Sequence, residues 1–143
     1  MLTNRSIPRC TVIPELGYPD IGEAIDWLCA AFDFTLRLRI ANHRAQLNVG
    51  DEAVVLTEGG PDKSDKSPAG AGLGHSVLVR VADVDAHHER ARQHGARIVR
   101  PPADQPYGER QYTAQDFVGR SWTFSQSIAD VAPEEWGGTS GQL

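Results

Sequence analysis

The sequence predicts an α+β domain built from two consecutive β-α-β-β-β modules. Apolar and polar residues alternate strictly in several short segments, and an aspartate precedes each of two helix-like segments. The whole pattern then returns: Asp33-Phe34 after the first helical segment matches Gly95-Ala96 after the second, 62 residues later. A helix packed on one side of an antiparallel sheet cannot bury its apolar face alone, so two such modules are expected to pack together.

The bulk composition is that of one ordinary globular domain. The chain has 143 residues, 40% of them hydrophobic, and a net charge of −5. It lacks an apolar run of about 18 residues, a signal-like N-terminus and a basic stripe, so we expect neither a membrane nor a nucleic-acid partner. The two cysteines, Cys10 and Cys29, fit no disulfide framework or zinc motif, and we expect a cytoplasmic protein with reduced thiols.

The first module is expected to span about residues 10–57. Residues 10–16 are apolar and β-branched, which indicates a strand, and Gly17-Tyr18-Pro19 indicates a turn. Asp20, with Glu23 three residues on, forms a capping-box-like helix start. The helix then carries one apolar face at three- and four-residue spacing: Ala24, Ile25, Leu28, Ala31 and Phe32.

Three strands should complete this module. Residues 34–40 alternate strictly, with Phe34, Leu36, Leu38 and Ile40 expected on one face and Thr35, Arg37 and Arg39 on the other. Residues 45–49 alternate again, and residues 53–56 are continuously apolar. Short strands at this spacing predict a meander.

A Gly-, Pro- and Ser-rich linker at 58–74 precedes the second module, expected over about 75–127. A strand at 75–81 leads to a helix capped by Asp83 and ended by Gly95. Ile98-Val99 is predicted as a short strand that Pro101-Pro102 ends, and residues 109–113 and 121–125 as a closing hairpin. The tail, 128–143, is predicted to lie on the surface, anchored by Trp136.

Three segments, in order, carry a family resemblance over about residues 10–127: YPDIGEAIDWLCAAFDF, GHSVLVRVADVDAHHERARQHGARI and YGERQYTAQDFVGRSWTFSQ. Together they resemble the glyoxalase / bleomycin-resistance / extradiol-dioxygenase superfamily, whose fold is the vicinal oxygen chelate fold. This resemblance implies eight strands in an open half-barrel cup, often completed by a second chain as a homodimer. In the enzymes of the family, the cup holds a divalent metal that polarises a substrate oxygen.

The resemblance also implies four metal-ligand positions, one on each of four strands. They fall at or near Ile13, on Val55, on His75 and on Thr123. His75 alone is a good ligand, because a divalent cation needs about four to six donors, mostly imidazole or carboxylate. Glu15, two residues from Ile13 on the same face, is the one rescue for the first position. We therefore expect no cofactor, with a divalent metal disfavoured.

Pocket residues are expected on the polar closing strand and near it: His75, Glu109, Arg110, Gln111, Tyr112 and Thr123. Alternation sends Glu109 and Gln111 to one face and Arg110 and Tyr112 to the other, and the sequence does not say which face lines the cup. Arg110 matches the family's common G-x-R pattern, which favours its side. Trp122 and Phe124 are expected in the core. His87, His88 and His94 are expected on a solvated helix face.

Three functions follow as hypotheses. The first, which we favour, is a metal-free protein of the bleomycin-resistance type that holds a small organic or cationic ligand in the cup at a dimer cleft. The second is a metal-dependent lyase or dioxygenase, and the third is a non-catalytic accessory domain. The sequence names neither the ligand nor a reaction, and it leaves open whether the modules pair within one chain or between two.

Overall fold

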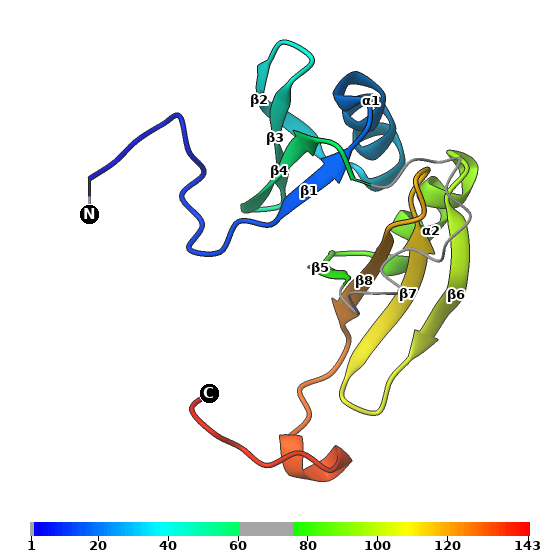
Figure 1. The fold of residues 1–143 in the computed structure, drawn as a ribbon. Helices are drawn as coiled ribbons and strands as arrows, with labels where there is room; N and C mark the ends of the chain where they lie inside the picture. Colours follow the sequence, from blue (N-terminus) through cyan, green and yellow to red (C-terminus); the bar gives the residue numbers. More distant parts are fainter. Residues whose placement is uncertain (1, 61–75) are drawn as a thin grey trace.

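A computed structural model describes residues 2–60 and 76–143 (Figure 1). Its elements follow the order β-α-β-β-β twice, as the sequence predicts, so the α+β fold class is confirmed. The first module comprises β1 (Glu15–Tyr18), α1 (Ile21–Phe32), β2 (Thr35–Ile40), β3 (Arg44–Val49) and β4 (Glu52–Glu58). The second comprises β5 (Val77–Arg80), α2 (Val84–Gln93), β6 (Arg97–Asp104), β7 (Glu109–Gln115) and β8 (Ser121–Ser127), before a short 3-10 helix η1 (Pro133–Trp136).

Each module forms its own four-stranded mixed sheet. The strand orders are β1-β4-β3-β2 and β5-β8-β7-β6, and in both sheets the first strand pairs in parallel with the last. The crossover helix covers one face of each sheet. Within the described ranges, no strand of the first sheet pairs with a strand of the second, so β1 and β5 each have a free edge.

The aspartate caps form as predicted at both helices. Asp20 accepts a hydrogen bond from the Glu23 amide, and Asp83 accepts one from the Ala86 amide. These carboxylates satisfy amides that the first turn of a helix leaves without a partner. Two residues separate β1 from α1, and three separate β5 from α2, so each helix begins close to the sheet that its apolar face covers.

The two modules share one hydrophobic core between their helix-covered faces. Phe32, at the end of α1, packs against Trp122 and Phe124 of β8, with ring centroids 5.6 and 4.8 Å apart. Trp122 and Phe124 are both fully buried, as expected for core aromatics. The opposite faces of the two sheets are therefore left for other contacts, and we call them the open face of the first sheet and the open face of the second sheet.

The structure corrects the first predicted strand. It begins at Glu15 rather than at residue 10, and it continues through Gly17 and Tyr18, where a turn was expected. The reason is tertiary: residues 15–18 pair with Val55–Glu58 of β4, and the Tyr18 side chain is fully buried. Pairing and burial outweigh the local turn signal.

The prediction that Pro101-Pro102 ends a short strand was also wrong, because β6 runs on to Asp104. β6 is the edge strand of its sheet, and its register with β7 shifts at Arg100 and before Ala103. Proline is tolerated at sheet edges and irregularities, since a residue there has no partner for its amide on one side.

The strict alternation expected over 34–40 is broken. The pairing of β2 with β3 shifts between Leu36 and Leu38, so Leu36 lies opposite Leu47 and Leu38 lies opposite Gln46. Leu47 belongs to the core, whereas Gln46 lies on the open face. A bulge of this kind re-aims the side chain at its centre, which here is Arg37.

The two terminal segments lie outside the paired strands of the modules (Figure 1). The N-terminal segment runs along the side of the first sheet that α1 does not cover, and the C-terminal segment continues from β8. Ile128 and Ala129 donate backbone hydrogen bonds to the Gly108 carbonyl at 2.8 and 3.2 Å, which ties the C-terminal segment to the β6–β7 turn. No helix among the described residues is long and apolar enough to span a membrane.

Candidate functional site

The open face of the second sheet carries a row of polar side chains. Glu109, Gln111 and Thr113 of β7 alternate with the core residues Tyr112 and Ala114, and they therefore point away from α2. Their cross-strand partners on β8 are Ser127, Ser125 and Thr123. This face is polar because it takes no part in the core that the two modules share.

Hydrogen bonds link Glu109, Ser125, Gln111 and Tyr107 into one network and join Thr113 to Thr123 as a separate pair. The Ser125 hydroxyl donates to Glu109 Oε1 at 2.6 Å and accepts from the Gln111 amide at 3.1 Å. The Tyr107 hydroxyl donates to Gln111 Oε1 at 2.9 Å, and the Thr113 and Thr123 hydroxyls are 2.8 Å apart. A network in which each member holds its neighbour presents fixed donors and acceptors to a ligand.

A cavity of about 190 Å³ opens beside this network. Its lining comprises Tyr107, Gln111, Tyr112, Thr113 and Thr123, with Arg100, Pro101 and Ala103 of β6 and Gln105 just after it. Two larger hollows, of about 480 and 560 Å³, follow the free edge of β5 at the junction of the modules. The smaller cavity is the better candidate ligand site, because several partly buried polar groups converge there. The larger hollows are lined by valines together with charged side chains, among them Asp33, Arg80 and Arg90 in one and Asp51 and Glu52 in the other.

Glu109 is the negative group of the open face. Hydrogen bonds from the Ser125 and Ser127 side chains, together with the nearby Arg80, hold the pKa of the Glu109 carboxyl below its usual value. The carboxylate is therefore ionised at neutral pH and already has hydroxyl donors around it.

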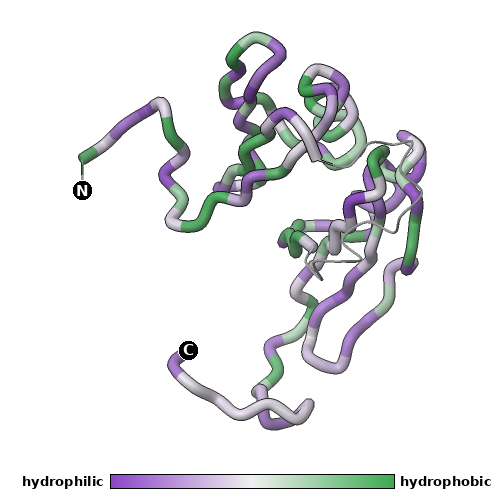
Figure 2. Tube along the Cα trace, in the orientation of Figure 1, coloured by the Kyte–Doolittle hydropathy of each residue, from purple (hydrophilic) through white to green (hydrophobic). Residues whose placement is uncertain are grey.

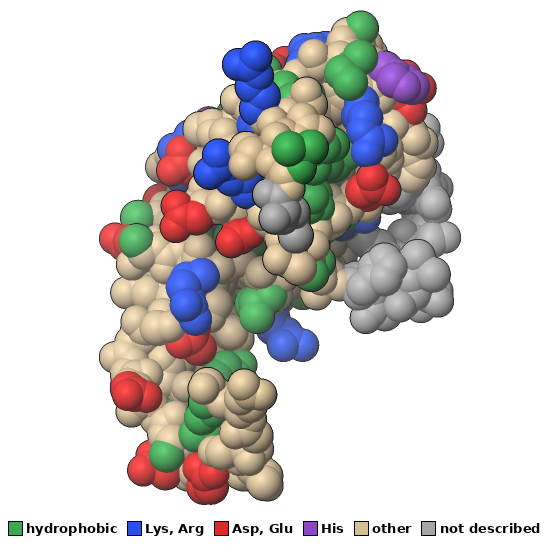
Figure 3. All heavy atoms as spheres, turned by 90° about the vertical axis from the view of Figure 1, so that its left-hand side faces the viewer, with side chains coloured by type: hydrophobic (Ala, Val, Ile, Leu, Met, Phe, Trp, Pro, Cys, Tyr) green, Lys and Arg blue, Asp and Glu red, His purple; other side chains and the backbone are tan. Residues whose placement is uncertain are grey.

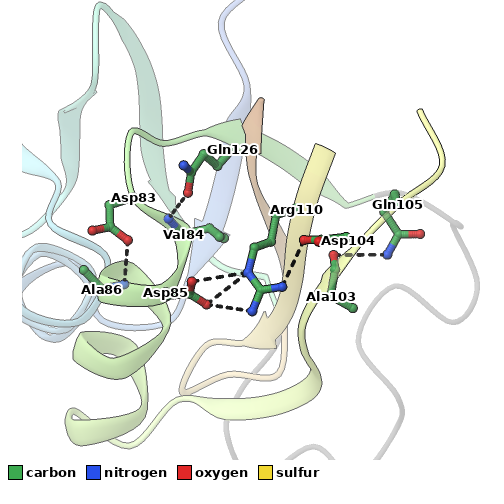
Figure 4. A network of polar contacts seen from close by, with 9 residues as sticks. All are labelled: Asp83, Val84, Asp85, Ala86, Ala103, Asp104, Gln105, Arg110 and Gln126. Carbon is green, nitrogen blue, oxygen red and sulfur yellow. Dashed lines mark hydrogen bonds and ion pairs between the residues drawn. The ribbon is translucent and has the colours of Figure 1, made fainter. Parts of the chain in front are cut away.

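Arg110 and Tyr112 lie on the other face of β7, toward α2. Figure 4 shows the Arg110 guanidinium between two carboxylates, those of Asp85 on α2 and Asp104 on β6. Its ion-pair distances are 3.1 and 3.0 Å. Arg110 thus ties α2 to the edge of the sheet, and it is not among the side chains on the open face.

Tyr112 and His87 form a hydrogen-bonded pair between the modules, in which Tyr112 is buried and His87 is half-buried. The Tyr112 hydroxyl lies 2.5 Å from His87 Nδ1, and His87 Nε2 lies 2.9 Å from the carbonyl oxygen of Phe32. Because a carbonyl only accepts, Nε2 carries the proton and Nδ1 accepts from the Tyr112 hydroxyl. The expectation of a solvated His87 was wrong: Val84 and Ala91, three and four residues away, share its helix face and are fully buried.

Burial sets the protonation of this pair. It lowers the pKa of His87, partly opposed by the Phe32 carbonyl and Asp33, and it raises the pKa of Tyr112. His87 is therefore a neutral imidazole that joins α2 to the end of α1.

A second buried polar contact joins the modules at the turn between β7 and β8. The Tyr18 hydroxyl of β1 donates to Asp116 Oδ2 at 2.7 Å, and Trp122 Nε1 donates to the same oxygen at 3.1 Å. Asp116 Oδ1 accepts from the backbone amides of Val118 and Arg120. Burial raises the pKa of Asp116 even though these hydrogen bonds oppose the rise. These contacts position the turn and leave no free group for chemistry.

The metal-ligand positions implied by the resemblance do not form a donor set. Val55 lies opposite Glu15 in the β1–β4 pair, and Glu15 is ion-paired with Arg44 at 2.8 Å. Ile13 precedes β1, the Thr123 hydroxyl is bonded to Thr113, and His75 lies outside the described residues. The part of the chain that the structure describes holds no group of three or more His, Cys, Asp or Glu side chains that could bind a metal. A valine and a threonine supply neither charge nor imidazole, so these positions do not fit a divalent metal.

Comparison with known proteins agrees with this geometry. The family model for the glyoxalase / bleomycin resistance protein / dioxygenase superfamily matches residues 7–124. The chain belongs to this superfamily. The structure also resembles TioX from Micromonospora sp. ML1, with 34% identity, a TM-score of 0.67 and coverage of 86% of this chain and all of that one.

The chain is also similar to two further proteins. An uncharacterised protein of Mycobacterium bovis is 30% identical over 131 residues, which cover 85% of this chain and 86% of that protein. The fosfomycin resistance protein FosX from Listeria monocytogenes shares the fold alone, with 14% identity, a TM-score of 0.64 and coverage of 94% and 98%. The expected family and the expected fold are therefore confirmed.

The structure divides the predicted pocket residues into two groups. Glu109, Gln111 and Thr123 come together on the open face, whereas Arg110 and Tyr112 lie on the helix-covered face. Sequence reasoning missed Tyr107 and Ser125, which complete the network. Ser125 could have been found from the β7–β8 pairing, but Tyr107 sits in a turn whose direction alternation does not fix.

Proposed function

We propose that the protein binds a small organic cation on the open face of the second sheet without a divalent metal. The observation that carries this proposal is the Glu109 carboxylate, which its serine neighbours keep ionised and which Ser125 links to Gln111, a lining residue of the cavity. An ionised carboxylate with its geometry already fixed attracts a cation with little reorganisation. Tyr107 adds an aromatic wall suited to the apolar part of such a ligand.

The C-terminal segment adds to this character. Trp136 packs against Tyr107 with ring centroids 5.1 Å apart and remains 46% exposed. Asp130, Glu134 and Glu135 belong to the same segment, and Figure 3 shows acidic side chains gathered at the end of the molecule where it lies. The C-terminal segment beside Tyr107 is therefore acidic and aromatic, which supports a cationic ligand there, while the cavity itself has one charged lining residue, Arg100.

We further propose that a second copy of the chain completes the cup. The two helix-covered faces are used in the shared core, so within the described chain neither open face is closed by the other. β5 is a short hydrophobic strand with a free edge (Figure 2), and its Leu78 is 65% exposed. A free edge and exposed leucine support a homodimer contact, since soluble proteins otherwise protect such edges.

The ligand proposal is tested by titrating the protein with benzyltrimethylammonium while following tryptophan fluorescence. Trp136 is the more exposed reporter beside Tyr107, whereas Trp122 is fully buried and the partly buried Trp27 lies on α1 of the first module. Glu109→Gln removes the charge with little change in shape and should weaken binding about tenfold or more, equivalent to about 1.4 kcal/mol or more. Glu58→Gln, on the first module, is the matched control. Equal affinity of wild type and Glu109→Gln would refute the proposed role of Glu109.

The metal-free part of the proposal has its own test. The stripped protein is titrated calorimetrically with Zn²⁺, Ni²⁺, Mn²⁺ and Fe²⁺, with His75→Ala alongside. We expect no stoichiometric binding. Tight binding that disappears in His75→Ala would contradict the proposal and make Glu15 the next candidate ligand.

The dimer is tested by sedimentation of the wild type and of Leu78→Glu over a range of concentrations. We expect a wild-type dimer that the substitution dissociates. Ile40→Glu is the control, since Ile40 is 52% exposed at the far edge strand of the first sheet. A wild type that sediments as a monomer at every concentration would refute the proposal that a second copy completes the cup.

A further inference from the structure

The open face of the first sheet is covered by the chain's own N-terminus. Residues 4–10, here called the N-terminal strap, run along the side of this sheet that α1 does not cover (Figure 1). Beneath them Gln46, Ala53 and Val55 are each 4% exposed, although Ala53 and Val55 lie outside the hydrophobic core. These three side chains lie on the open face and are therefore covered there. The polar row on the open face of the second sheet, in contrast, remains partly exposed.

Two side chains of the sheet hold the strap, and they hold it by its backbone. Arg37 Nη2 donates to the carbonyl oxygens of Arg5 and Ile7 at 2.9 and 3.3 Å. Gln46 Nε2 donates to the carbonyl of Ser6 at 3.0 Å, and Gln46 Oε1 accepts from Arg37 Nη1. The two side chains thus form one clamp for three consecutive carbonyls. The clamp contacts no side-chain group of the strap.

The strap itself buries little apolar surface. Ile7 is 50% exposed, and the flanking Leu2 and Val12 are 93% and 78% exposed. Pro8 is the one buried residue of the strap. Segments with few buried apolar contacts and exposed hydrogen bonds open locally at low free energy. The strap is therefore held mainly by the clamp, and it can leave without disturbing the core.

We propose that Arg37 and Gln46 form a second binding site, for an extended peptide-like backbone, and that the N-terminal strap closes this site until such a ligand displaces it. The clamp suits a peptide-like ligand because a forked guanidinium and an amide can donate to successive backbone carbonyl oxygens, whatever side chains the ligand carries. The strap is itself an example of the bound ligand. This site lies on the first module and stands independently of the cation site at Glu109.

Cys10, at the end of the strap, reports on its position. The Glu52 carboxylate, chiefly as a hydrogen-bond partner, raises the pKa of the Cys10 thiol above its usual value. An open strap separates Cys10 from Glu52, so the thiol becomes more accessible and more readily deprotonated, and it is alkylated faster. Cys29, on α1, serves as an internal reference in the same molecule.

The test is the rate of iodoacetamide labelling at Cys10 relative to Cys29, followed by peptide mass spectrometry on the full chain. Arg37→Ala should raise the relative rate about tenfold or more, the effect expected for the loss of charge-assisted hydrogen bonds. Arg37→Lys, which keeps the charge but loses the fork, should also raise it. Arg39→Ala is the matched control, because Arg39 on the same strand bonds to Ala41 and Asn42 and not to the strap.

The ligand is tested with acetyl-trialanine amide as the probe. In the wild type it should raise the Cys10 labelling rate with a saturable dependence on concentration, and in Arg37→Ala it should add nothing. If Arg37→Ala labels like the wild type, the clamp does not hold the strap and the proposal fails. If Arg37→Ala labels faster but the probe has no effect up to its solubility limit, the assignment of a peptide-like ligand is overturned.

Discussion

Removing the Tyr18 hydroxyl should weaken the joint between the two modules. Tyr18 belongs to β1 and Asp116 to the turn between β7 and β8, so their 2.7 Å hydrogen bond spans 98 residues of sequence. Tyr18→Phe keeps the ring, which stacks on Phe117 and lies under the Arg120 guanidinium. The substitution therefore removes one buried hydrogen bond and little else.

The magnitude follows from burial. Tyr18 is 0% and Asp116 5% exposed, so water cannot replace the lost donor. Asp116 Oδ2 keeps its second donor, Trp122 Nε1, which limits the penalty. A hydrogen bond to a charged group contributes about 1.5–3 kcal/mol, and we expect a loss of about 2 kcal/mol in the free energy of unfolding.

Urea unfolding at a fixed protein concentration measures this loss, because stability depends on concentration if the protein is a dimer. Tyr107→Phe is the control: it also removes a hydroxyl that donates a hydrogen bond, but at a partly exposed site. We expect it to cost less than about 0.5 kcal/mol. A Tyr18→Phe value as small as that of Tyr107→Phe would refute the idea that this buried contact joins the modules.

Two further predictions concern the same framework. Burial lowers the pKa of His87 from its ordinary 6.5 in the folded protein, so the contribution of His87 to stability is present above pH 6.5 and is lost as the pH falls from 6.5 toward the folded pKa. Urea unfolding from pH 7.5 to 5 should show this loss, and His87→Gln should reduce it. An equal loss in wild type and His87→Gln would mean that His87 titrates as it would in solvent. Gly108 has φ +83° and an added Cβ would meet the Ala129 carbonyl oxygen at 2.4 Å, whereas at Gly95, with φ +86°, it would meet nothing within 4 Å. Gly108→Ala should therefore lower the unfolding midpoint more than Gly95→Ala, and equal midpoints would contradict the close approach of the C-terminal segment.

The sequence was sufficient for the repeated fold because the signals that define it are local. Asp20 and Asp83 cap helices by bonding to amides three residues away, and the apolar spacing after Asp20 gives a face of the helix directly. Trp122 and Phe124 were assigned to the core because the family resemblance puts Thr123 on the cup face and alternation puts its two neighbours on the other face. Each of these inferences needs no knowledge of a distant partner.

The details that failed depend on distant partners. β1 reaches Tyr18 because β4 pairs with it, and β6 continues through two prolines because it lies at an edge. Arg37 reaches the N-terminal strap because a bulge interrupts the alternation of β2. His87 is half-buried because α1 ends beside it, which only the packing of the two modules decides.

The candidate site could be predicted from the sequence only in part, for the same reason. Alternation separated Glu109 and Gln111 from Arg110 and Tyr112, but it could not say which pair faces the helix. That answer comes from α2, whose Asp85 binds Arg110 and whose His87 binds Tyr112. The polar row on the open face is what remains when the helix has taken the other pair.

Amide chemical-shift mapping by NMR, with benzyltrimethylammonium as the ligand, tests the central claim most directly. The account predicts that saturable shifts concentrate at the open-face positions of β7 and β8, around Glu109, Gln111 and Thr123, and that Glu109→Gln removes them. Shifts confined to the first module or to the free edge of β5, and unchanged in Glu109→Gln, would contradict it.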